Sequence, residues 1–459
     1  MIGKILIVDD VSTNRIVFKV KLAAAGYQTV MASDGDACLR LAVSEMPDII
    51  LLDLFLPDLS GIEVLKALKS DPQTRRIPVV MFASEVDPAL RLAAISGGAE
   101  DFMARPIDDQ RLLARLRGLL RAREHLAGIE APEHDFQVLG LSEPAMHFEM
   151  PGQIALVMPK GERALHLKRE LAAEGHDRFS VLAPDEVHAD HRGPAPDVYL
   201  IHADLNGPGG GLRMMSELLS RSTTRHAAFC IFNPEAPQVL AATAFDLGAQ
   251  DVVDAATPPA ELALRLHALV TRKREGDRMR ASVQDGLRLA VFDPLTGLHN
   301  RRYGTAQLNA IAERARAESS AFAVMIVDID RFKTVNDRWG HAAGDAVLVE
   351  VAARLAANLR ATDLLARVGG EEFLIALPAT ALSDAQSAAN RLCRAIDSAP
   401  VVLPDGMHVS ITISIGMTTG GTAPSDKANV TELVEQADRA LMHSKSHGRN
   451  QVTVIRDAA

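Results

Sequence analysis

The sequence predicts a multi-domain protein: two α/β domains, each a doubly wound parallel sheet, followed by an α+β domain. Three observations favour this class. Short apolar runs alternate with helical patterns over residues 1–125, and the same pattern repeats as a whole from residue 151. After residue 291 the strict alternation of strands and helices ends, and two predicted strands follow each other directly. A length of 459 residues suits about three domains of ordinary size.

Composition narrows the classes of function. The formal net charge of −10 gives no general attraction to nucleic acid, so we expect no nucleic-acid partner. Cys38, Cys230 and Cys393 lie too far apart in sequence for a metal-ligand spacing, which disfavours a disulfide scaffold or a zinc ribbon. No signal pattern begins the chain, and no apolar run approaches the roughly 18 to 20 residues that span a bilayer. We therefore expect a cytoplasmic protein without membrane insertion.

Residues 1–125 form the first predicted domain. KILIV, DIILLDL and IPVVMFA are apolar runs typical of buried strands, whereas SGIEVLKALKS and DQRLLARLRGLLRARE have helical periodicity. Strands that alternate with helices predict a parallel sheet with right-handed crossovers. Residues 126–150 have no period and several Pro and Gly residues, which indicates a linker.

Residues 151–272 repeat the pattern of the first domain. PDVYLIHADL is similar to PDIILLDL, and GAQDVVDAATPPAELALRL is similar to GAEDFMARPIDDQRLLARL. Residues 273–291 are charged and indicate a linker helix. Residues 292–459 form the third domain, in which helices and strands are mixed and the two apolar runs around Gly369-Gly370 favour antiparallel pairing.

Carboxylates follow two predicted strands of the first domain, at Asp9, Asp10 and Asp53. Ligands of an open parallel sheet bind beyond the carboxyl ends of its strands, so we expect these acids to converge. A single Asp there is more often a helix cap or a solvated loop residue. Three together repel one another unless a hard cation such as Mg²⁺ lies among them, and a metal-bound carboxylate can attack phosphorus. The three acids thus favour a metal site.

With LFLPDLSG after Asp53 and DFMARP near the end of the domain, these acids resemble the receiver domain of response regulators, which has a flavodoxin-like sheet. The resemblance implies that Asp53 accepts phosphate from a cognate histidine kinase or phosphotransfer protein, with Asp9, Asp10 and Asp53 around Mg²⁺.

Two positions depart from the receiver pattern. Ala83, followed by Ser84, stands where the family usually has Ser or Thr, and Arg105 stands where it usually has Lys. Arg keeps the positive charge but not the compact geometry of an ammonium group. Phe102 fills the position of the switch aromatic residue. We expect phosphorylation, while the effect of Ala83 and Arg105 on the switch stays open.

The second domain has the frame of the first without its acids. The residues that replace Asp9, Asp10, Asp53 and Arg105 are Met158, Pro159, His202 and Ala255. Met and Pro cannot hold a metal ion, so phosphorylation is implausible, and a lone His at a strand end is usually a packed residue. We predict a receiver-like adaptor that serves docking or dimerisation.

In the third domain, Asp328 ends an apolar strand, and Glu371 follows the Gly369-Gly370 pair. Gly-Gly between two apolar runs predicts a hairpin, because tight turns need positive φ, and it lets backbone approach a ligand. Two carboxylates around a divalent metal suit phosphoryl or nucleotidyl transfer. A solvated acidic hairpin explains the spacing about equally well.

Six ordered motifs decide between these interpretations: DPLTGLHNRR, DIDRFKTVND, GHAAGD, RVGGEEF, SIG and KSHGRN. Together they resemble the GGDEF family of diguanylate cyclases in its GGEEF form, whose fold is related to nucleotide cyclases and polymerase palms. The whole chain resembles PleD-type response regulators. The resemblance implies that two GTP are joined into cyclic di-GMP with release of two pyrophosphates, by two such domains that meet in a homodimer formed through the receivers.

The resemblance also implies roles for single residues. Asp328, Glu371 and the carbonyl of Ile329 are expected to bind Mg²⁺ or Mn²⁺, with Glu371 also helping to deprotonate the 3′-hydroxyl. Guanine and phosphate contacts are expected from Asn336, Asp345, Lys333, Lys445, Arg449, the backbone of Phe332, Gly369 and Gly370. Arg360 and Asp363 match the family's product-inhibition site, where Arg391 and Arg314 could add to the binding of cyclic di-GMP. As bare chemistry, the spacing of Arg360 and Asp363 usually means a surface ion pair at a helix end, and Arg391 and Arg314 are equally well explained as arginines of a helical surface.

Two functions remain in competition. The first is a diguanylate cyclase controlled by phosphorylation of Asp53 and by dimerisation. The second is a catalytically silent module that binds cyclic di-GMP or GTP and signals through protein contacts. Loss of the metal carboxylates or of the glycine pair would favour the second, and neither is lost.

Overall fold

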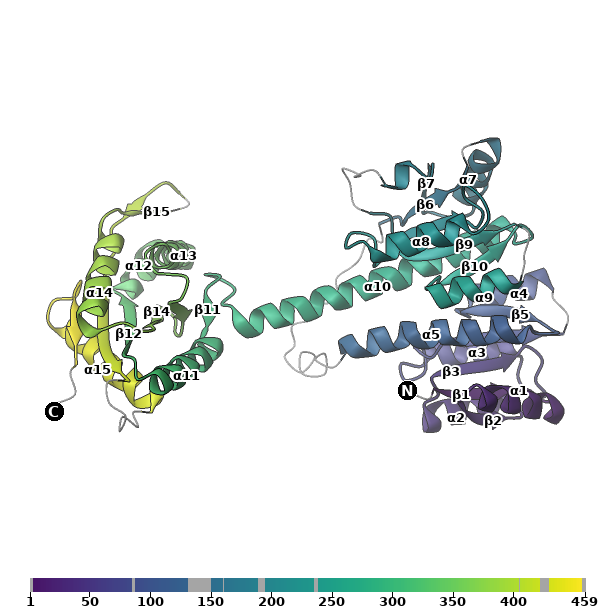
Figure 1. The fold of residues 1–459 in the computed structure, drawn as a ribbon, viewed down its shortest axis with the longest axis horizontal. Helices are drawn as coiled ribbons and strands as arrows, with labels where there is room; N and C mark the ends of the chain where they lie inside the picture. The colour runs from purple at the N-terminus through teal and green to yellow at the C-terminus, as the bar shows by residue number, and fades with distance from the viewer. Residues whose placement is uncertain are drawn as a thin grey trace. The chain divides into compact units, whose positions relative to one another are not determined.

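The computed structural model (Figure 1) describes residues 3–84, 87–130, 150–159, 161–188, 195–234, 238–403, 405–421 and 429–455. Most of the predicted linker at 126–150 lies outside these ranges. Residue contacts divide the chain into two compact units, Met1–Ala281 and Ser282–Ala459. Among the described residues, no helix has the length and apolarity that a membrane span requires.

The first domain has a five-stranded parallel sheet with strand order β2-β1-β3-β4-β5. Its strands are β1 (Lys4–Val8), β2 (Gln28–Ala32), β3 (Ile49–Asp53), β4 (Val79–Ala83) and β5 (Asp101–Ala104). Its helices are α1 (Ser12–Ala24), α2 (Gly35–Glu45), α3 (Gly61–Ser70), α4 (Pro88–Ser96) and α5 (Asp109–Glu130). The apolar runs of β3 and β4 are wholly buried, as a sheet covered on both faces requires.

The second domain repeats this topology, with strand order β10-β9-β8-β6-β7, again all parallel. Its strands are β6 (Gln153–Val157), β7 (Arg178–Leu182), β8 (Val198–His202), β9 (Ala228–Asn233) and β10 (Asp251–Asp254). Its helices are α7 (Glu162–Glu174), a 3-10 turn at Glu186–His188, α8 (Gly210–Ser220), α9 (Gln238–Leu247) and α10 (Pro259–Val291). The predicted pair of doubly wound sheets is confirmed.

In both domains, the backbone at the start of one helix lies very close to the end of the central strand. A Cβ atom on Gly61 would lie 2.4 Å from the carbonyl oxygen of Asp53, and one on Gly211 would lie 2.1 Å from that of His202. Only glycine fits where the helix after the central strand begins this close to the end of the strand. The second domain therefore keeps the geometry of the strand end although it has lost the acid.

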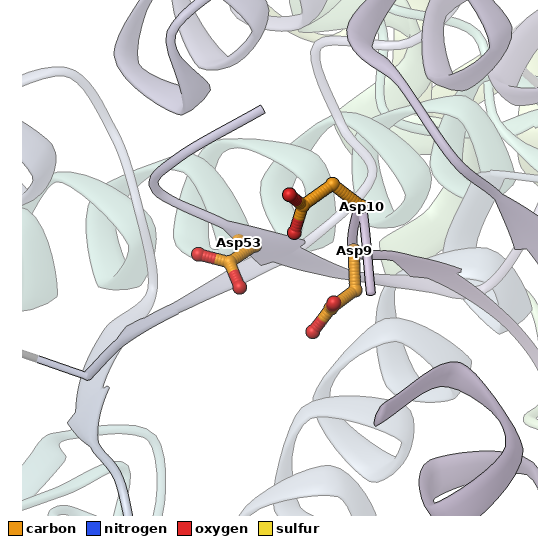
Figure 2. A group of neighbouring side chains, drawn as sticks. All are labelled: Asp9, Asp10 and Asp53. Carbon is orange, nitrogen blue, oxygen red and sulfur yellow. The ribbon is translucent and has the colours of Figure 1, made fainter. Parts of the chain in front are cut away.

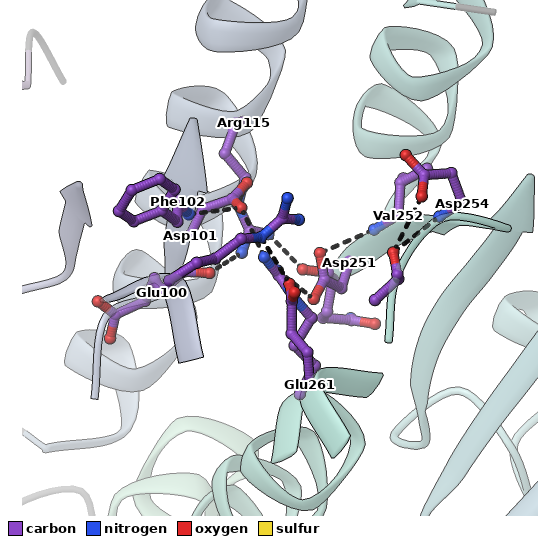
Figure 3. Close-up of polar contacts among 12 residues, drawn as sticks. Glu100, Asp101, Phe102, Arg115, Asp251, Val252, Asp254 and Glu261 are labelled. Carbon is purple, nitrogen blue, oxygen red and sulfur yellow. Dashed lines mark hydrogen bonds and ion pairs between the residues drawn. The ribbon is translucent and has the colours of Figure 1, made fainter. Parts of the chain in front are cut away.

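A buried ion cluster joins the two receiver-like domains (Figure 3). Arg265 of α10 bonds to Asp251 of its own domain (Nη1 to Oδ2, 3.0 Å) and to Asp101 of the first domain (Nη2 to Oδ1, 3.3 Å). Arg115 of α5 pairs with Asp101 and donates to the carbonyl of Gln250. Burial raises the pKa of Asp101, but Arg265 and Arg115 outweigh it and hold that pKa at about 2. The contact is nearly symmetric, since each domain contributes one Arg and one Asp from equivalent places.

Helix α10 runs without a break through residues 259–291, so the predicted linker helix continues the last helix of the second domain. Its length of 33 residues corresponds to about 50 Å at 1.5 Å per residue.

The second unit contains a six-stranded sheet with strand order β11-β13-β14-β12-β17-β18. Its strands are β11 (His299–Asn300), β12 (Phe322–Ile329), β13 (Leu364–Arg367), β14 (Glu372–Leu377), β17 (Ile413–Gly420) and β18 (Val452–Val454), beside a small pair, β15 (Val401–Val402) and β16 (His408–Val409). The central strand β12 is antiparallel to both neighbours. The predicted α+β domain with antiparallel pairing is confirmed.

Helices cover both faces of this sheet. They are α11 (Arg301–Glu318), α12 (Phe332–Trp339), α13 (His341–Ala357), α14 (Leu382–Asp397) and α15 (Val430–Ser446). One apolar core includes residues of α13 and α14, and the other includes residues of α11 and α15. Every residue of β12 is buried between them, which carries Asp328 to a shielded place near the end of the strand.

Candidate functional sites

The three acids of the first domain converge beyond the ends of β1 and β3 (Figure 2). Asp9, Asp10 and Asp53 each offer one oxygen, and these oxygens all lie within 4.8 Å of one another. Asp9 and Asp53 are buried, whereas Asp10 is exposed. Within the described part of the chain, no other group of three His, Cys, Asp or Glu residues comes this close. The oxygen donors and their spacing fit a divalent cation of the Mg²⁺ type.

Arg105 offsets part of the negative charge of this pocket. Its Nη2 atom donates to Oδ2 of Asp53 at 2.9 Å and also to Oδ2 of Asp9. Burial raises the pKa of Asp53 to about 6, although the N–H of Phe55 and the charge of Arg105 oppose the rise. Ala83 ends β4, fully buried, and has no hydroxyl, while Phe102 is packed in the core of the domain.

The equivalent place in the second domain is not acidic. His202 ends β8, and its Nδ1 accepts a hydrogen bond from the backbone N–H of Asp204 at 3.2 Å. Burial lowers the pKa of His202, and its ring packs against that of Phe232 with centroids 5.8 Å apart. Met158 is buried in the core. The side chain of His202 is therefore a packed residue, as predicted for a lone His at a strand end.

In the third domain, Asp328 lies in register with Glu372 of β14 on one side and with Ser414 of β17 on the other. Burial raises the pKa of Asp328, against the lowering effect of Lys445, whose Nζ lies 2.7 Å from Oδ2 of Asp328. Lys445 lies in α15, one residue before the end of the helix. Lys445, which was expected to bind phosphate, thus contacts Asp328, which was expected to bind the metal ion.

The predicted hairpin forms between β13 and β14, with Glu371 in its turn. The carbonyl of Glu371 accepts from the N–H of Ile329 at 3.3 Å, which places the turn beside the end of β12. Burial, and then the charge of Asp328, raise the pKa of the Glu371 carboxyl. The charge of Asp328 therefore disfavours the ionisation of Glu371, which suits a cation shared by the two carboxylates.

The reason given for the glycine pair needs correction, because neither Gly369 nor Gly370 has a positive φ. A Cβ on Gly369 would lie 2.5 Å from a carboxylate oxygen at the flexible end of Glu372 and 3.2 Å from the Cβ of that residue, so the side of the turn at Gly369 is crowded. Nothing lies within 4 Å of a Cβ on Gly370, so the backbone there is open to a ligand.

Two supports of the site were missed in the sequence. Arg367 donates to the carbonyl of Gly370 at 2.7 Å and pairs with Asp293 at 3.0 Å. It therefore ties the turn between β13 and β14 to the segment that contains Asp293. Asp330 is buried, and its carboxylate accepts from hydroxyls of Thr412 and Ser414, each at 2.7 Å, and from the N–H of Asn450 at 3.0 Å. Asp330 thereby fixes the loop that carries Arg449. Asp293, which pairs with Arg367, and all three partners of Asp330 lie far away in sequence, so no local signal marked these two supports.

The expected guanine and phosphate contacts come from α12 and α13. Asn336 is half-buried, and its Oδ1 would lie 1.9 Å from a Cβ on Gly344, so it packs on bare backbone beside the exposed Asp345. Helix α12 begins at Phe332, where first-turn N–H groups have no partner within the helix, and Lys333 is exposed.

A cavity of about 590 Å³ lies beside α11 and includes Arg360, Asp363 and Arg314 in its lining. The N–H of Arg360 donates to the carboxylate of Asp363 at 2.8 Å, which shapes the turn after α13. Arg391 is not part of this lining and donates to the carbonyl of Asn358 at 3.1 Å. The stacked rings of His299 and Tyr303, with centroids 4.2 Å apart, also line the cavity and were not anticipated.

Two family models match the chain: the response regulator receiver domain over residues 5–117, and the diguanylate cyclase GGDEF domain over residues 290–451. The response regulator PleD of Caulobacter vibrioides is 35% identical over 456 residues, which are 98% of this chain and 99% of PleD. The chain belongs to the PleD-type response regulators. It is a response regulator with a diguanylate cyclase domain.

Two further proteins are similar to a smaller share of this PleD-type chain. The diguanylate cyclase DgcP of Pseudomonas aeruginosa is 36% identical over 198 residues, 42% of this chain and 29% of DgcP. Among solved structures, the coiled coil and GGDEF domain of DgcB from Caulobacter crescentus in complex with c-di-GMP is 29% identical. Its TM-score is 0.37, and the match covers 41% of this chain and 99% of that chain.

Proposed function

We propose that the third domain condenses two GTP into cyclic di-GMP and that the receiver domains control it. The observation that carries the proposal is the cluster of Asp328, Glu371 and Lys445: two carboxylates with raised pKa around one ammonium group. Each 3′-hydroxyl attacks the α-phosphorus of the other GTP, so two P–O bonds form and two pyrophosphates leave.

Asp328, Glu371 and the carbonyl of Ile329 would hold a divalent ion, Mg²⁺ or Mn²⁺, which when bound supplies charge neutralisation at the phosphates and a lower pKa for the attacking hydroxyl. The raised pKa of Glu371 suits it to take up the hydroxyl proton. Lys445 turns from Asp328 toward phosphate, with Lys333, Arg449 and the N–H groups at Phe332. Asn336 and Asp345 read the guanine edge, and the open backbone at Gly369 and Gly370 lets the nucleotide approach.

Each domain holds one GTP, so catalysis requires two copies face to face, and a homodimer through the receivers would bring them together. A histidine kinase or phosphotransfer protein would supply phosphate to Asp53, with Mg²⁺ among Asp9, Asp10 and Asp53. The product, cyclic di-GMP, would inhibit from the cavity that Arg360, Asp363 and Arg314 line. Arg391 can join only if it releases Asn358, or as part of another subunit.

The decisive test is incubation of the full-length protein with GTP and Mg²⁺, followed by chromatography for cyclic di-GMP and pyrophosphate. We expect Glu371→Gln to lower turnover at least about 100-fold, because the amide can neither take a proton nor bind the ion as an anion. Glu313→Gln, an exposed residue of α11, is the matched control and keeps wild-type turnover. Turnover by E371Q at the wild-type rate would contradict the assigned role.

The inhibitory cavity is tested with Arg360→Ala. Loss of the guanidinium should weaken product inhibition by about 10-fold or more, since charge-assisted hydrogen bonds contribute about 1.5–3 kcal/mol. Initial rates are measured against added cyclic di-GMP, and the uninhibited rate should stay unchanged. An unchanged inhibition constant would exclude Arg360 from the inhibitory site.

The alternative is a silent module that binds GTP or cyclic di-GMP and acts through protein contacts. It is favoured if the wild-type dimer retains nucleotide but makes no product in the same assay.

A further inference from the structure

The acidic pocket of the first domain already contains a positively charged side chain, the guanidinium of Arg105. The inner oxygens of the acids accept from nearby N–H groups: Oδ1 of Asp9 from Val11 at 2.8 Å and Asn14 at 3.2 Å, and Oδ1 of Asp53 from Phe55 at 3.1 Å. The two Oδ2 atoms then share one donor, Nη2 of Arg105. Every carboxylate oxygen of Asp9 and Asp53 thus already has a protein donor.

Arg105 is held firmly in this place. The carbon of its guanidinium lies 4.8 Å from the centroid of the buried Phe82 ring, within the range of a cation–π contact. Its side chain is 20% exposed, while that of Asp9 is fully buried. The Arg105 guanidinium is therefore an ordered part of the pocket.

We propose that Arg105 is an internal counter-cation that competes with the divalent ion for Oδ2 of Asp9 and Asp53, so that metal enters this pocket only by displacing the guanidinium. Mg²⁺ approaches its oxygen ligands to about 2.1 Å. Nη2 lies 2.9 Å from Oδ2 of Asp53 and also contacts Asp9. A divalent ion on the same oxygens would lie next to this positive charge, and the two would repel strongly in this buried place.

An Arg side chain at this position competes with the divalent ion more strongly than a Lys side chain would. The guanidinium is planar, permanently charged and presents its N–H donors in a rigid fork, whereas a Lys ammonium is compact and sits on a flexible stem that withdraws easily. The inference concerns metal affinity alone and does not depend on phosphorylation or on cyclase activity.

The test is calorimetric titration of the full-length protein with MgCl₂ at pH 8, without nucleotide or phosphoryl donor. Heat from the first domain is identified by its loss in Asp10→Asn, since Asp10 is exposed and its side chain is apart from the Arg105 contacts. We expect Arg105→Gln to tighten this binding about tenfold, the equivalent of one charged hydrogen bond that no longer has to break. Arg105→Lys should tighten it by a smaller factor.

Arg15 provides a matched control. Its Nη1 donates to the backbone carbonyls of Asp9, at 2.6 Å, and Asp10, at 2.9 Å. Replacing Arg15 therefore removes a positive charge near the pocket, as replacing Arg105 does, but frees no carboxylate oxygen. Arg15→Gln should change Mg²⁺ affinity much less than Arg105→Gln does.

If R105Q binds Mg²⁺ with wild-type affinity, the proposal is overturned. It is also overturned if R15Q tightens Mg²⁺ binding as much as R105Q does, because the effect would then come from removing a nearby positive charge and not from freeing the carboxylate oxygens. Circular dichroism and thermal unfolding establish that each variant is folded. If R105Q does not fold, the comparison of R105K with the wild type decides, and unchanged affinity in R105K then refutes the competition.

Discussion

The two receiver-like domains have one topology and different chemistry. Both sheets are parallel with matching strand orders, and in both a glycine meets the end of the central strand. The first keeps Asp53 there with Arg105 beside it, whereas the second has His202 packed against Phe232. The buried ion cluster at their mutual contact has one Arg and one Asp from each domain. A repeat can therefore lose its reactive pocket and keep both its frame and its contact surface.

The strongest way to sharpen this comparison is to remove the acceptor. Asp53→Asn should abolish incorporation of phosphate from an acyl phosphate donor, because a neutral amide does not attack phosphorus. His202→Asn should leave incorporation at the wild-type level, since Met158 and Pro159 stand where the first domain has Asp9 and Asp10. Intact-protein mass spectrometry measures both. Phosphate on D53N would place the acceptor elsewhere.

The shared contact can be broken at its centre. Arg265→Met should lower the free energy of unfolding of the first unit by about 3–5 kcal/mol, because it leaves Asp101 and Asp251 buried without their main partner. Urea unfolding followed by circular dichroism measures the change. Arg272→Met, at an exposed place in the same helix, should change stability by less than about 0.5 kcal/mol. Equal values for the two variants would show that the cluster adds little to stability.

The smallest effect concerns the cost of keeping a buried acid. Burial raises the pKa of Asp53 from 3.8 to about 6, so the folded state binds this proton more tightly than the unfolded state does. Its contribution to stability is complete below pH 3.8 and is lost as the pH rises through about 6. At pH 8 without divalent ions, Asp53→Asn should therefore raise the free energy of unfolding by about 1–3 kcal/mol relative to its effect at pH 4. The same difference at both pH values would contradict the pKa assignment.

Much of the fold could be predicted because it is written in local patterns. Apolar runs marked the strands, and acids at the ends of these runs marked both pockets, since side chains at neighbouring strand ends must meet. The roles of Arg367 and Asp330, and the cluster of Arg115 and Arg265, escaped prediction because each depends on at least one partner distant in sequence. The glycine pair was placed correctly for a wrong reason: neither glycine has a left-handed backbone, and the tight place in the turn is beside Gly369.

The tandem arrangement also separates two kinds of association. The contacts of Arg115 and Arg265 join segments of a single polypeptide, so dilution does not weaken them, and their effective local concentration is set by the tether. Encounter between two polypeptides obeys mass action instead. The amount of this protein in a cell would thus govern only the second kind of union, and a rise in expression could itself act as a stimulus.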